Sequence, residues 1–265
     1  MCYIPPDHRF SFSSLALHDE CPMAFKLRYI DHVKDEGNGF SDYGSFAHKL
    51  LEEWAKGETP DIALAAEYED RYDDEVIHPF PPFPKGMPAR YYDAGLAYFE
   101  SFEGFGDVEI LDVEQRFEFQ VEGGRRPYTF VGVVDLVVRD KATGAIDIID
   151  HKSKSAAQMK KDFPLYRKQL YTYARFVHDK YGVWPRRIGF NLFKEGGQMV
   201  WEDFTMAGYE ETMQWIIDSI EAILDEKEWK VTVSPFFCRF LCSCLDECPA
   251  KDAVLYSKKK DDPDG

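Results

Sequence analysis

The chain lacks any long apolar run. No segment approaches the roughly 18 consecutive apolar residues that a transmembrane helix requires. The first residues, MCYIPPDHRFSF, also lack the charged and then apolar layout of a secretory signal. We therefore expect a cytoplasmic, reducing location and no membrane partner.

Positive charge is scarce. The sequence has 32 Lys and Arg against 48 Asp and Glu, and its formal net charge is −16. Because phosphate binding is driven mainly by Lys and Arg, this balance argues against nucleic-acid binding over the whole surface. It does not exclude a local basic path. Carboxylates that bind divalent ions also count as negative until the ions are bound.

Internal repeats and low-complexity linkers are missing as well. With 265 residues, of which 45% are hydrophobic, the chain can bury a sizeable core and is not disordered as a whole. We expect one domain spanning 1–265. Its parts would be a helical N-terminal region (1–105), a catalytic sheet core (106–207), and a C-terminal helix with a cysteine cluster (208–265).

Apolar spacing predicts helices over 11–30, 42–54 and 89–102 in the first part. Ser11 or Ser13 can cap the first helix, and Pro22 is expected to kink it. The proline-rich stretch 79–88 predicts a loop.

Strand patterns dominate the middle of the chain. Alternating, β-branched and aromatic residues predict strands over 108–120, 128–138 and 145–152, followed by short strands around 188–193 and 200–204. Helices are predicted over 163–181, ending at Gly182, and over 208–226. The expected fold class is α/β, with a central mixed β-sheet flanked by helices.

Two acidic residues and a lysine stand out in neighbouring strands. GVVD ends at Asp135, and IIDHK ends at Lys152 after a turn. Because side chains alternate along a strand, Asp150 and Lys152 share a face and Asp147 points away. If the two strands pair, Asp135 lies beside Asp150, so that two carboxylates and an ammonium converge.

This set suits metal-assisted phosphate chemistry. Mg²⁺ and Mn²⁺ prefer oxygen ligands, and a nearby lysine can position water or bind phosphate. A D-x-K pair alone is common in hairpins that carry only surface charge. Here Asp135 and Asp150 interrupt apolar runs, and a buried carboxylate is costly unless it is paired or bound to metal. The pattern therefore favours a functional site.

Several further blocks follow one another in a recognisable order. They are Ser11-x-Ser13-x-Leu15 running on to Cys21-Pro22 and Phe25, Gly44-x-x-x-His48-x-x-Leu51, GVVD, IIDHKSK, Gln169-x-x-x-Tyr173, and a C-terminal cysteine cluster. In this order the chain resembles the RecB/AddB-like exonucleases of the PD-(D/E)XK superfamily, including the CRISPR-associated RecB-like exonucleases and phage relatives.

The resemblance implies a restriction-endonuclease-like core that hydrolyses DNA with Mg²⁺ or Mn²⁺, with exonucleolytic action on single-stranded ends as the expected mode. The implied catalytic residues are Asp135, Asp150, Lys152, Gln169 and Tyr173. The implied metal ligands are His48, Asp135, Asp150 and the backbone carbonyl of His151. Glu114 is implied as an outer carboxylate.

Six cysteines are present, and four of them crowd into 238–248. In a reducing compartment they can hold an iron–sulfur cluster, hold zinc, or be plain buried thiols. The resemblance favours a structural [4Fe–4S] cluster on Cys21, Cys238, Cys242 and Cys248, with Cys244 as a substitute for Cys242. The spacing x₃ then x₅ departs from the C-x₂-C-x₅-C-like spacing of that family.

Two other functions compete with the enzyme. One is a nuclease fold with structural zinc, kept for nucleic-acid or protein contacts without turnover. The other is a subunit of a recombination or CRISPR complex, in which a helicase would be a separate partner because the sequence has no P-loop. The intact Asp, Asp, Lys and His set favours an active enzyme.

Overall fold

The computed structural model describes residues 4–82 and 84–256, so Cys2 lies outside the described residues. The chain divides into two compact units. Unit 1 comprises 1–38, 120–130 and 215–265, and unit 2 comprises 39–119 and 131–214. The expectation of a single nuclease domain in three parts stays a prediction.

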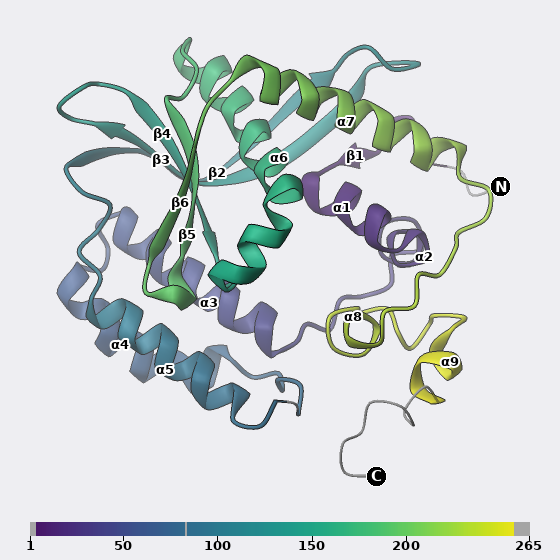
Figure 1. Cartoon of the computed structure of the whole chain (residues 1–265), viewed down its shortest axis with the longest axis horizontal. Helices are drawn as coiled ribbons and strands as arrows, with labels where there is room; N and C mark the ends of the chain where they lie inside the picture. Colours follow the sequence, from purple (N-terminus) through teal and green to yellow (C-terminus); the bar gives the residue numbers. More distant parts are fainter. Residues whose placement is uncertain (1–3, 83, 257–265) are drawn as a thin grey trace. The chain divides into compact units, whose positions relative to one another are not determined.

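The strands form one mixed sheet (Figure 1). They are β1 (Arg9–Phe10), β2 (Val108–Val121), β3 (Tyr128–Asp140), β4 (Ile146–Lys152), β5 (Arg187–Leu192) and β6 (Gln198–Asp203). The order is β1-β3-β4-β5-β6, and β2 pairs with β3. β4 runs antiparallel to β3 and parallel to β5. The expected fold class, a mixed sheet flanked by helices, is confirmed.

The central strand β4 is buried on both faces. Its first six residues are buried, as its run of isoleucines predicts. On one face, Ile148 packs in a core with residues of α6 (Ala156–Tyr181), such as Leu170 and Ala174. On the opposite face, Ile149 packs with Leu136 and Val138 of β3. This burial makes any charged group on β4 costly unless it has a partner.

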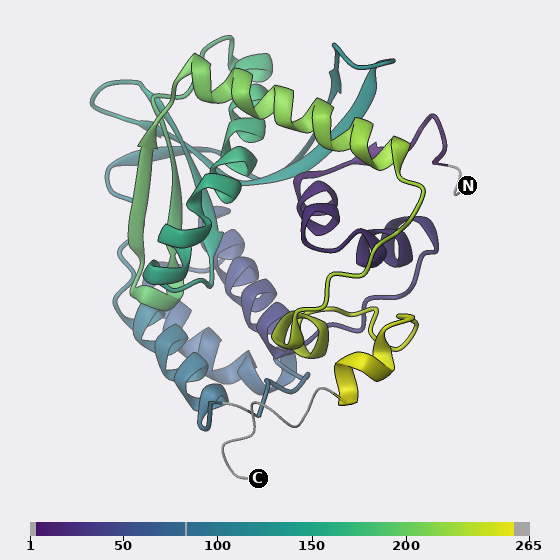
Figure 2. The same cartoon turned by 45° about the vertical axis from the view of Figure 1, so that its right-hand side comes forward.

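Three helices of unit 2 build a separate aromatic core. They are α3 (Gly39–Ala55), α4 (Leu64–Glu75) and α5 (Met87–Glu100), with the 3₁₀ turn η2 (Asp61–Ala63) before α4, and they lie side by side in Figure 1 and Figure 2. A second 3₁₀ turn, η3 (Phe193–Glu195), follows β5. The aromatic core between α3, α4 and α5 buries four large side chains, Tyr43, Phe46, Tyr68 and Phe99. This packing holds α3, which carries His48, in place.

The sequence predicted a single helix over 11–30, and the extent of that helix was wrong. The chain forms α1 (Phe12–Glu20), α2 (Pro22–Phe25) and the π-helical turn η1 (Lys26–Ile30) instead of one helix over 11–30. Cys21 is extended, with φ −156°, and Pro22 begins a new helix at a position where its missing N–H is not needed. Ser11 caps α1 through a reciprocal bond with Ser14.

The second half also differs at its helix boundaries. α6 begins at Ala156, earlier than the predicted start at residue 163, and Pro164 lies inside it. Gly182 ends α6 in the left-handed conformation, as predicted. Three further helices are α7 (Met206–Asp225), α8 (Pro235–Phe240) and α9 (Lys251–Tyr256).

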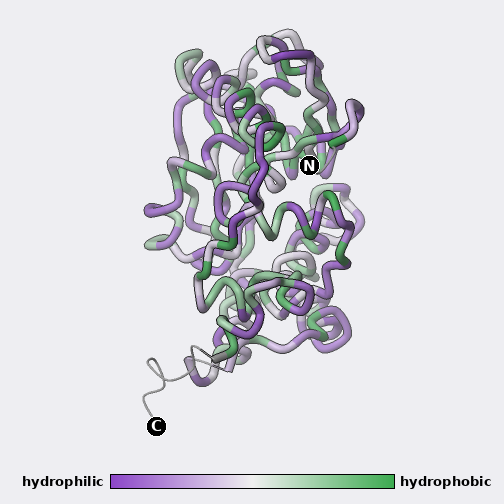
Figure 3. The backbone as a smooth tube through the Cα atoms, turned by 90° about the vertical axis from the view of Figure 1, so that its right-hand side faces the viewer, coloured by the Kyte–Doolittle hydropathy of each residue, from purple (hydrophilic) through white to green (hydrophobic). Residues whose placement is uncertain are grey.

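Hydrophobic and hydrophilic residues are mixed along most of the chain (Figure 3). Within 4–82 and 84–256, no helix has both the length and the apolar character that a membrane span requires.

Candidate active site

Antiparallel pairing brings two acidic strand positions together. The ladder between β3 and β4 ends with Leu136 opposite Ile149, and the next residue on each strand beyond it is an aspartate, Asp135 or Asp150. The backbone N–H of His151 donates to Asp135 Oδ2 at 2.8 Å. Both aspartates are buried, and Asp150 is 0% exposed. The hairpin therefore concentrates negative charge where water cannot screen it.

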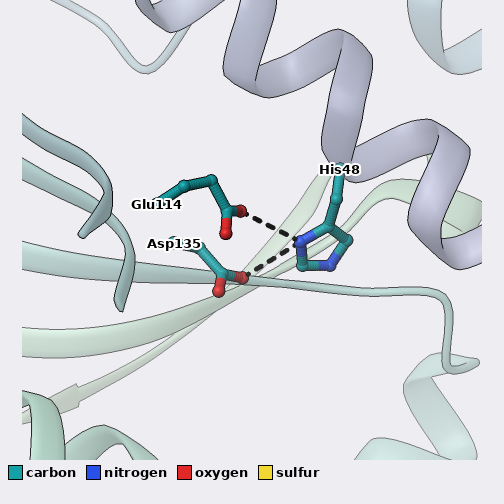
Figure 4. A group of neighbouring side chains, drawn as sticks. All are labelled: His48, Glu114 and Asp135. Atoms are coloured by element: carbon teal, nitrogen blue, oxygen red, sulfur yellow. Dashed lines mark ion pairs between the residues drawn. The ribbon is translucent and has the colours of Figure 1, made fainter. Parts of the chain in front are cut away.

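A histidine from α3 completes a compact group of ligand atoms with two carboxylates. His48, Glu114 of β2 and Asp135 of β3 each offer an atom, and these atoms lie within 4.8 Å of one another. His48 Nδ1 is 3.5 Å from Glu114 Oε1 and 3.5 Å from Asp135 Oδ2 (Figure 4). One nitrogen and two carboxylate oxygens suit a divalent cation such as Mg²⁺ or Mn²⁺.

Asp150 belongs to a second set on the α6 face of the sheet. Its Oδ2 pairs with Lys152 Nζ at 2.5 Å, and its Oδ1 accepts a hydrogen bond from the Tyr173 hydroxyl at 3.2 Å. Gln169 Nε2 donates to the same hydroxyl at 2.6 Å. Gln169 and Tyr173 lie one helical turn apart on α6, so the helix delivers both side chains to one carboxylate.

The charges of these groups act on one another. Burial, followed by the Asp135 charge, raises the pKa of Asp150 to about 6. Burial lowers the pKa of His48, but the Asp135 and Glu114 carboxylates outweigh it and raise that pKa to about 9. Burial also opposes the charge on Lys152, yet Asp150 and Asp135 raise its pKa. Without a metal ion, the site thus balances two cations against its carboxylates.

Comparison with known proteins identifies the family. The model of the PD-(D/E)XK nuclease superfamily matches residues 9–252, which is most of the chain. The chain belongs to the PD-(D/E)XK nuclease superfamily. No curated protein matches it.

Two solved structures resemble this PD-(D/E)XK protein. One is the crystal structure of SSO0001, with 14% identity, a TM-score of 0.40, and coverage of 94% of this chain and 89% of that one. The other is named "Putative exonuclease" from Eubacterium rectale, with 11% identity, a TM-score of 0.44, and coverage of 88% and 93%.

His151 of this PD-(D/E)XK protein faces His48 through its backbone, while its ring makes other contacts. Its carbonyl oxygen is 2.9 Å from His48 Nε2. Its Nδ1 is 3.1 Å from Asn191 Nδ2, which donates at 2.8 Å to the Tyr98 hydroxyl. The ring also stacks on Phe105. Burial holds the pKa of His151 well below its usual value, so the ring is neutral.

Asn191 and Tyr98 were missed by the sequence analysis. A signal existed for Asn191, because it is a polar residue between Phe190 and Leu192 in a buried strand. A buried amide in such a strand needs partners, and it finds them in Tyr98 and His151. Nothing in the spacing of Tyr98 distinguishes it from an ordinary core residue.

Asp147 points away from the catalytic set, as strand alternation predicts. It is buried and accepts hydrogen bonds from Arg186 Nε at 3.0 Å and Arg187 Nε at 2.9 Å. Its role in the structure is therefore to satisfy two arginines at the start of β5. It takes no part in the group around His48.

A pocket of about 340 Å³ lies on the same side of the sheet as the His151 ring. Tyr98, Phe105, Asn191 and Trp201 are among its lining residues. His48, Asp135, Asp150 and Lys152 do not line it. The pocket therefore borders the residues that hold His151 and does not enclose these four candidate site residues.

The cysteines of unit 1 gather where its two chain ends meet. Met23 N–H donates to the Lys230 carbonyl at 3.0 Å, and Phe25 stacks on Trp229 with ring centroids 6.0 Å apart. These contacts join the Cys21 segment to the segment that leads into α8. The described cysteines, which are Cys21, Cys238, Cys242, Cys244 and Cys248, are all free thiols.

All five described thiols take part in mutual charge interactions. Burial raises the pKa of Cys242 to about 11, and Cys244, Cys238 and Cys21 act in the same direction. Burial likewise raises the pKa of Cys248, again with contributions from Cys21 and Cys238. Within the described residues, no three of these sulfurs lie within 4.8 Å of one another. The sulfurs therefore form a loose group.

Proposed function

We propose that the chain is a metal-dependent deoxyribonuclease of the RecB/AddB-like group that hydrolyses phosphodiester bonds at single-stranded DNA ends. The observation that carries the proposal is the convergence of buried Asp135 and Asp150 with Lys152 and His48 in a PD-(D/E)XK protein. Four charged side chains from three elements, α3, β3 and β4, would not be gathered at this cost for packing alone.

The metal ion in this proposal is Mg²⁺ or Mn²⁺, held at His48 and Asp135, with Asp150 on the neighbouring strand and the His151 carbonyl next to them. The donor atoms fit such an ion, because His48, Glu114 and Asp135 offer a nitrogen and carboxylate oxygens within 4.8 Å of one another. When bound, the ion supplies an acidified water and stabilises charge on the phosphate.

Lys152 is the catalytic lysine in this proposal. It is 18% exposed and is paired with Asp150, which keeps its ammonium charged at the surface of the site. A charged lysine there can bind a phosphate oxygen and orient the attacking water. Tyr173 stays neutral, because burial raises its pKa, so it can only hold Asp150 by donating its proton in a hydrogen bond.

The end of β4 and helix α6 carry a local excess of Lys and Arg, of which four pair with carboxylates: Lys152 with Asp150, Lys154 with Asp162, Arg167 with Glu202, and Arg175 with Asp179. Residues 151–178 contain seven Lys and Arg against one Asp, in a chain of net charge −16. Lys154 lies 4.4 Å over the Tyr166 ring, next to Lys152. Lys160 and Lys161 are exposed on α6. Cations beside an aromatic ring are typical of single-strand binding, which favours DNA strands as substrate.

The cysteines hold a [4Fe–4S] cluster in this proposal, on Cys21, Cys238, Cys242 and Cys248. Zinc needs sulfurs about 3.8 Å apart, because Zn–S bonds are about 2.3 Å long in a tetrahedral shell. The described thiols interact through their charges, but no three of their sulfurs lie within 4.8 Å of one another. An iron–sulfur cube, which stands between its thiolates, suits wider spacing. The cluster would tie the two ends of unit 1 together.

An anaerobic nuclease assay with matched substrates tests the proposal. The protein is incubated with end-labelled single-stranded DNA, double-stranded DNA and RNA, in Mg²⁺, Mn²⁺ or EDTA. We expect single-stranded DNA to shorten from an end with either metal and to stay intact in EDTA. Binding of all substrates without cleavage would contradict the proposal and favour a binding module that keeps the nuclease fold.

A further inference from the structure

The glycines that lie inside the helices of 4–82 and 84–256 differ in what surrounds them. A Cβ added to Gly39, Gly95 or Gly208 would lie under 3.0 Å from an aromatic side chain, so packing requires a glycine at each. Gly44 of α3 is different. Apart from its chain neighbours and the local helix backbone, the one described atom within 4 Å of such a Cβ is Ser153 Oγ, at 4.0 Å. Close packing therefore does not explain this glycine.

The backbone of Gly44 does not explain it either. Gly44 lies inside a helix of 17 residues and is not among the glycines with a positive φ, so any residue could adopt its conformation. Glycine inside a helix is also less favourable than alanine, because it loses more conformational freedom on folding. Glycine is otherwise used where a ligand approaches the backbone closely, and this use fits the open space beside Gly44.

Gly44 lies on the face of α3 that carries His48. Residues four apart are neighbours on a helix surface, and both of these residues are half-buried. Tyr43, Phe46 and Ala47, in contrast, are buried in the aromatic core on the other side of α3. Helical side chains lean toward the N-terminus, so that of His48 leans back toward the turn of Gly44 as it reaches the candidate site (Figure 4). The open space therefore adjoins that site.

Ser153 lies opposite Gly44 and belongs to the segment that leaves β4. It follows Lys152 directly, and Lys154, with its Nζ over the Tyr166 ring, comes next. Ser153 is half-buried, and within 4–82 and 84–256 its hydroxyl has no hydrogen-bond partner. A serine hydroxyl can donate to a phosphate oxygen, as serines commonly do in DNA complexes. The space between Gly44 and Ser153 therefore has a hydroxyl and two lysines near it.

We propose that the bare helix backbone at Gly44 leaves room for the sugar–phosphate backbone of the substrate strand, which lies between α3 and Ser153 next to the bond that is cut. This assignment rests on the proposed nuclease function. Because metal-assisted hydrolysis requires the scissile phosphate beside the ion, the strand must pass close to His48. Gly44 is one helical turn, about 5.4 Å, from His48. The part of the strand that it meets is therefore the neighbouring sugar and phosphate, and any side chain at position 44 would displace them.

Gly44→Ala in the full chain tests the assignment. The added methyl group meets Ser153 Oγ but no atom of His48 or Lys152 within 4 Å, so it fills the space without touching these site residues. Gly44→Leu fills more of the same space. The matched controls are Ser45→Ala and Ser45→Leu, at the next position of α3, which is exposed. Single-turnover cleavage of end-labelled single-stranded DNA in Mn²⁺, thermal unfolding, and Mn²⁺ affinity by electron paramagnetic resonance are measured for every protein.

DNA cleavage should fall with the size of the side chain at position 44. We expect Gly44→Ala to be at least about tenfold slower than the wild type and Gly44→Leu at least about 100-fold slower, because a substrate displaced by about 1 Å can lose about 100-fold in rate. Gly44→Ala should bind Mn²⁺ as the wild type does, and its thermal midpoint should be equal or higher, since alanine favours the helix. Both Ser45 variants should cleave at the wild-type rate.

Cleavage by Gly44→Ala at the wild-type rate would overturn the assignment. Slower cleavage together with a lower thermal midpoint or a weaker Mn²⁺ affinity of Gly44→Ala would also overturn it, since Gly44 would then act through packing or through the ion site. If the wild type and both Ser45 variants cleave no DNA in Mn²⁺, the proposed nuclease function itself fails, and the role of Gly44 fails with it.

Discussion

The substitution Asp150→Asn tests how burial and charge act on the metal-free site. Asp150 is 0% exposed, and burial, followed by the charge of Asp135, raises its pKa from 3.8 to about 6, even though Lys152 opposes the rise. Between pH 3.8 and about pH 6, the folded protein therefore keeps a proton on the Asp150 carboxyl that the unfolded chain has already released. The asparagine side chain has the same shape and no proton to lose.

The size and sign of the effect follow from this difference in pKa. A tenfold change in an equilibrium corresponds to about 1.4 kcal/mol, so ionised Asp150 costs the metal-free fold on the order of 3 kcal/mol. The stability that this group contributes is fully present below its unfolded pKa of 3.8 and is lost as the pH rises through about 6. Asp150→Asn should therefore match the wild type near pH 4 and exceed it by about 3 kcal/mol near pH 7.5.

Urea unfolding in EDTA at several pH values measures both proteins. The difference between the two free energies of unfolding isolates residue 150 from the many other carboxylates of the chain. Adding Mn²⁺ near pH 7.5 should restore the stability of the wild type more than that of the variant, because metal compensates the buried charge. A difference that does not change with pH, or a variant that is less stable near pH 7.5, would refute this reasoning.

Three further substitutions address other parts of the molecule. Asp147→Ala should leave DNA cleavage near the wild-type rate but lower the free energy of unfolding by about 2 kcal/mol, because two charge-assisted hydrogen bonds to arginines are lost; parallel cleavage and urea assays check this. Changing Lys160 and Lys161 together to glutamate should weaken the binding of single-stranded DNA and reduce the slope of log K against log salt by about 1.4. Fluorescence anisotropy in EDTA measures both quantities. An unchanged slope would show that neither lysine contacts the DNA. Cys21→Ala should remove the brown colour and lower the thermal stability of anaerobically purified protein, whereas Cys2→Ala should do neither; a colourless wild type with one tightly bound zinc would replace the iron–sulfur cluster by a zinc site.

Regular strands made part of the site predictable. β4 keeps strict alternation, so Asp150 meets Lys152 on one face while Asp147 turns to arginines on the other. The register of β3 with β4 could also be predicted from the sequence, because a short turn fixes how the two strands pair. Local periodicity therefore predicted the pairing of β3 with β4 and the shared face of Asp150 and Lys152 from sequence alone.

Irregular backbone and long-range packing explain why other features of the site and the fold could not be predicted from the sequence. Glu114 has a positive φ and its side chain meets His48, and no spacing rule predicts such a backbone for glutamate. The approach of His48 to His151 joins residues far apart in sequence, and only the order of family motifs suggested it. Helix α4 was missed because it is largely acidic, and only Leu64, Tyr68 and Tyr72 face its core.

The cleavage rate of Lys152→Met tests the central claim most directly. Wild type, Lys152→Met and the surface control Lys141→Met are compared on end-labelled single-stranded DNA under single-turnover conditions in Mn²⁺ and in EDTA. The proposed mechanism predicts that wild type and control cleave only with Mn²⁺, and that Lys152→Met is slower by at least about 100-fold while it remains folded. Cleavage by Lys152→Met at the wild-type rate, or cleavage by the wild type in EDTA, would contradict a metal-dependent nuclease centred on Asp135, Asp150 and Lys152.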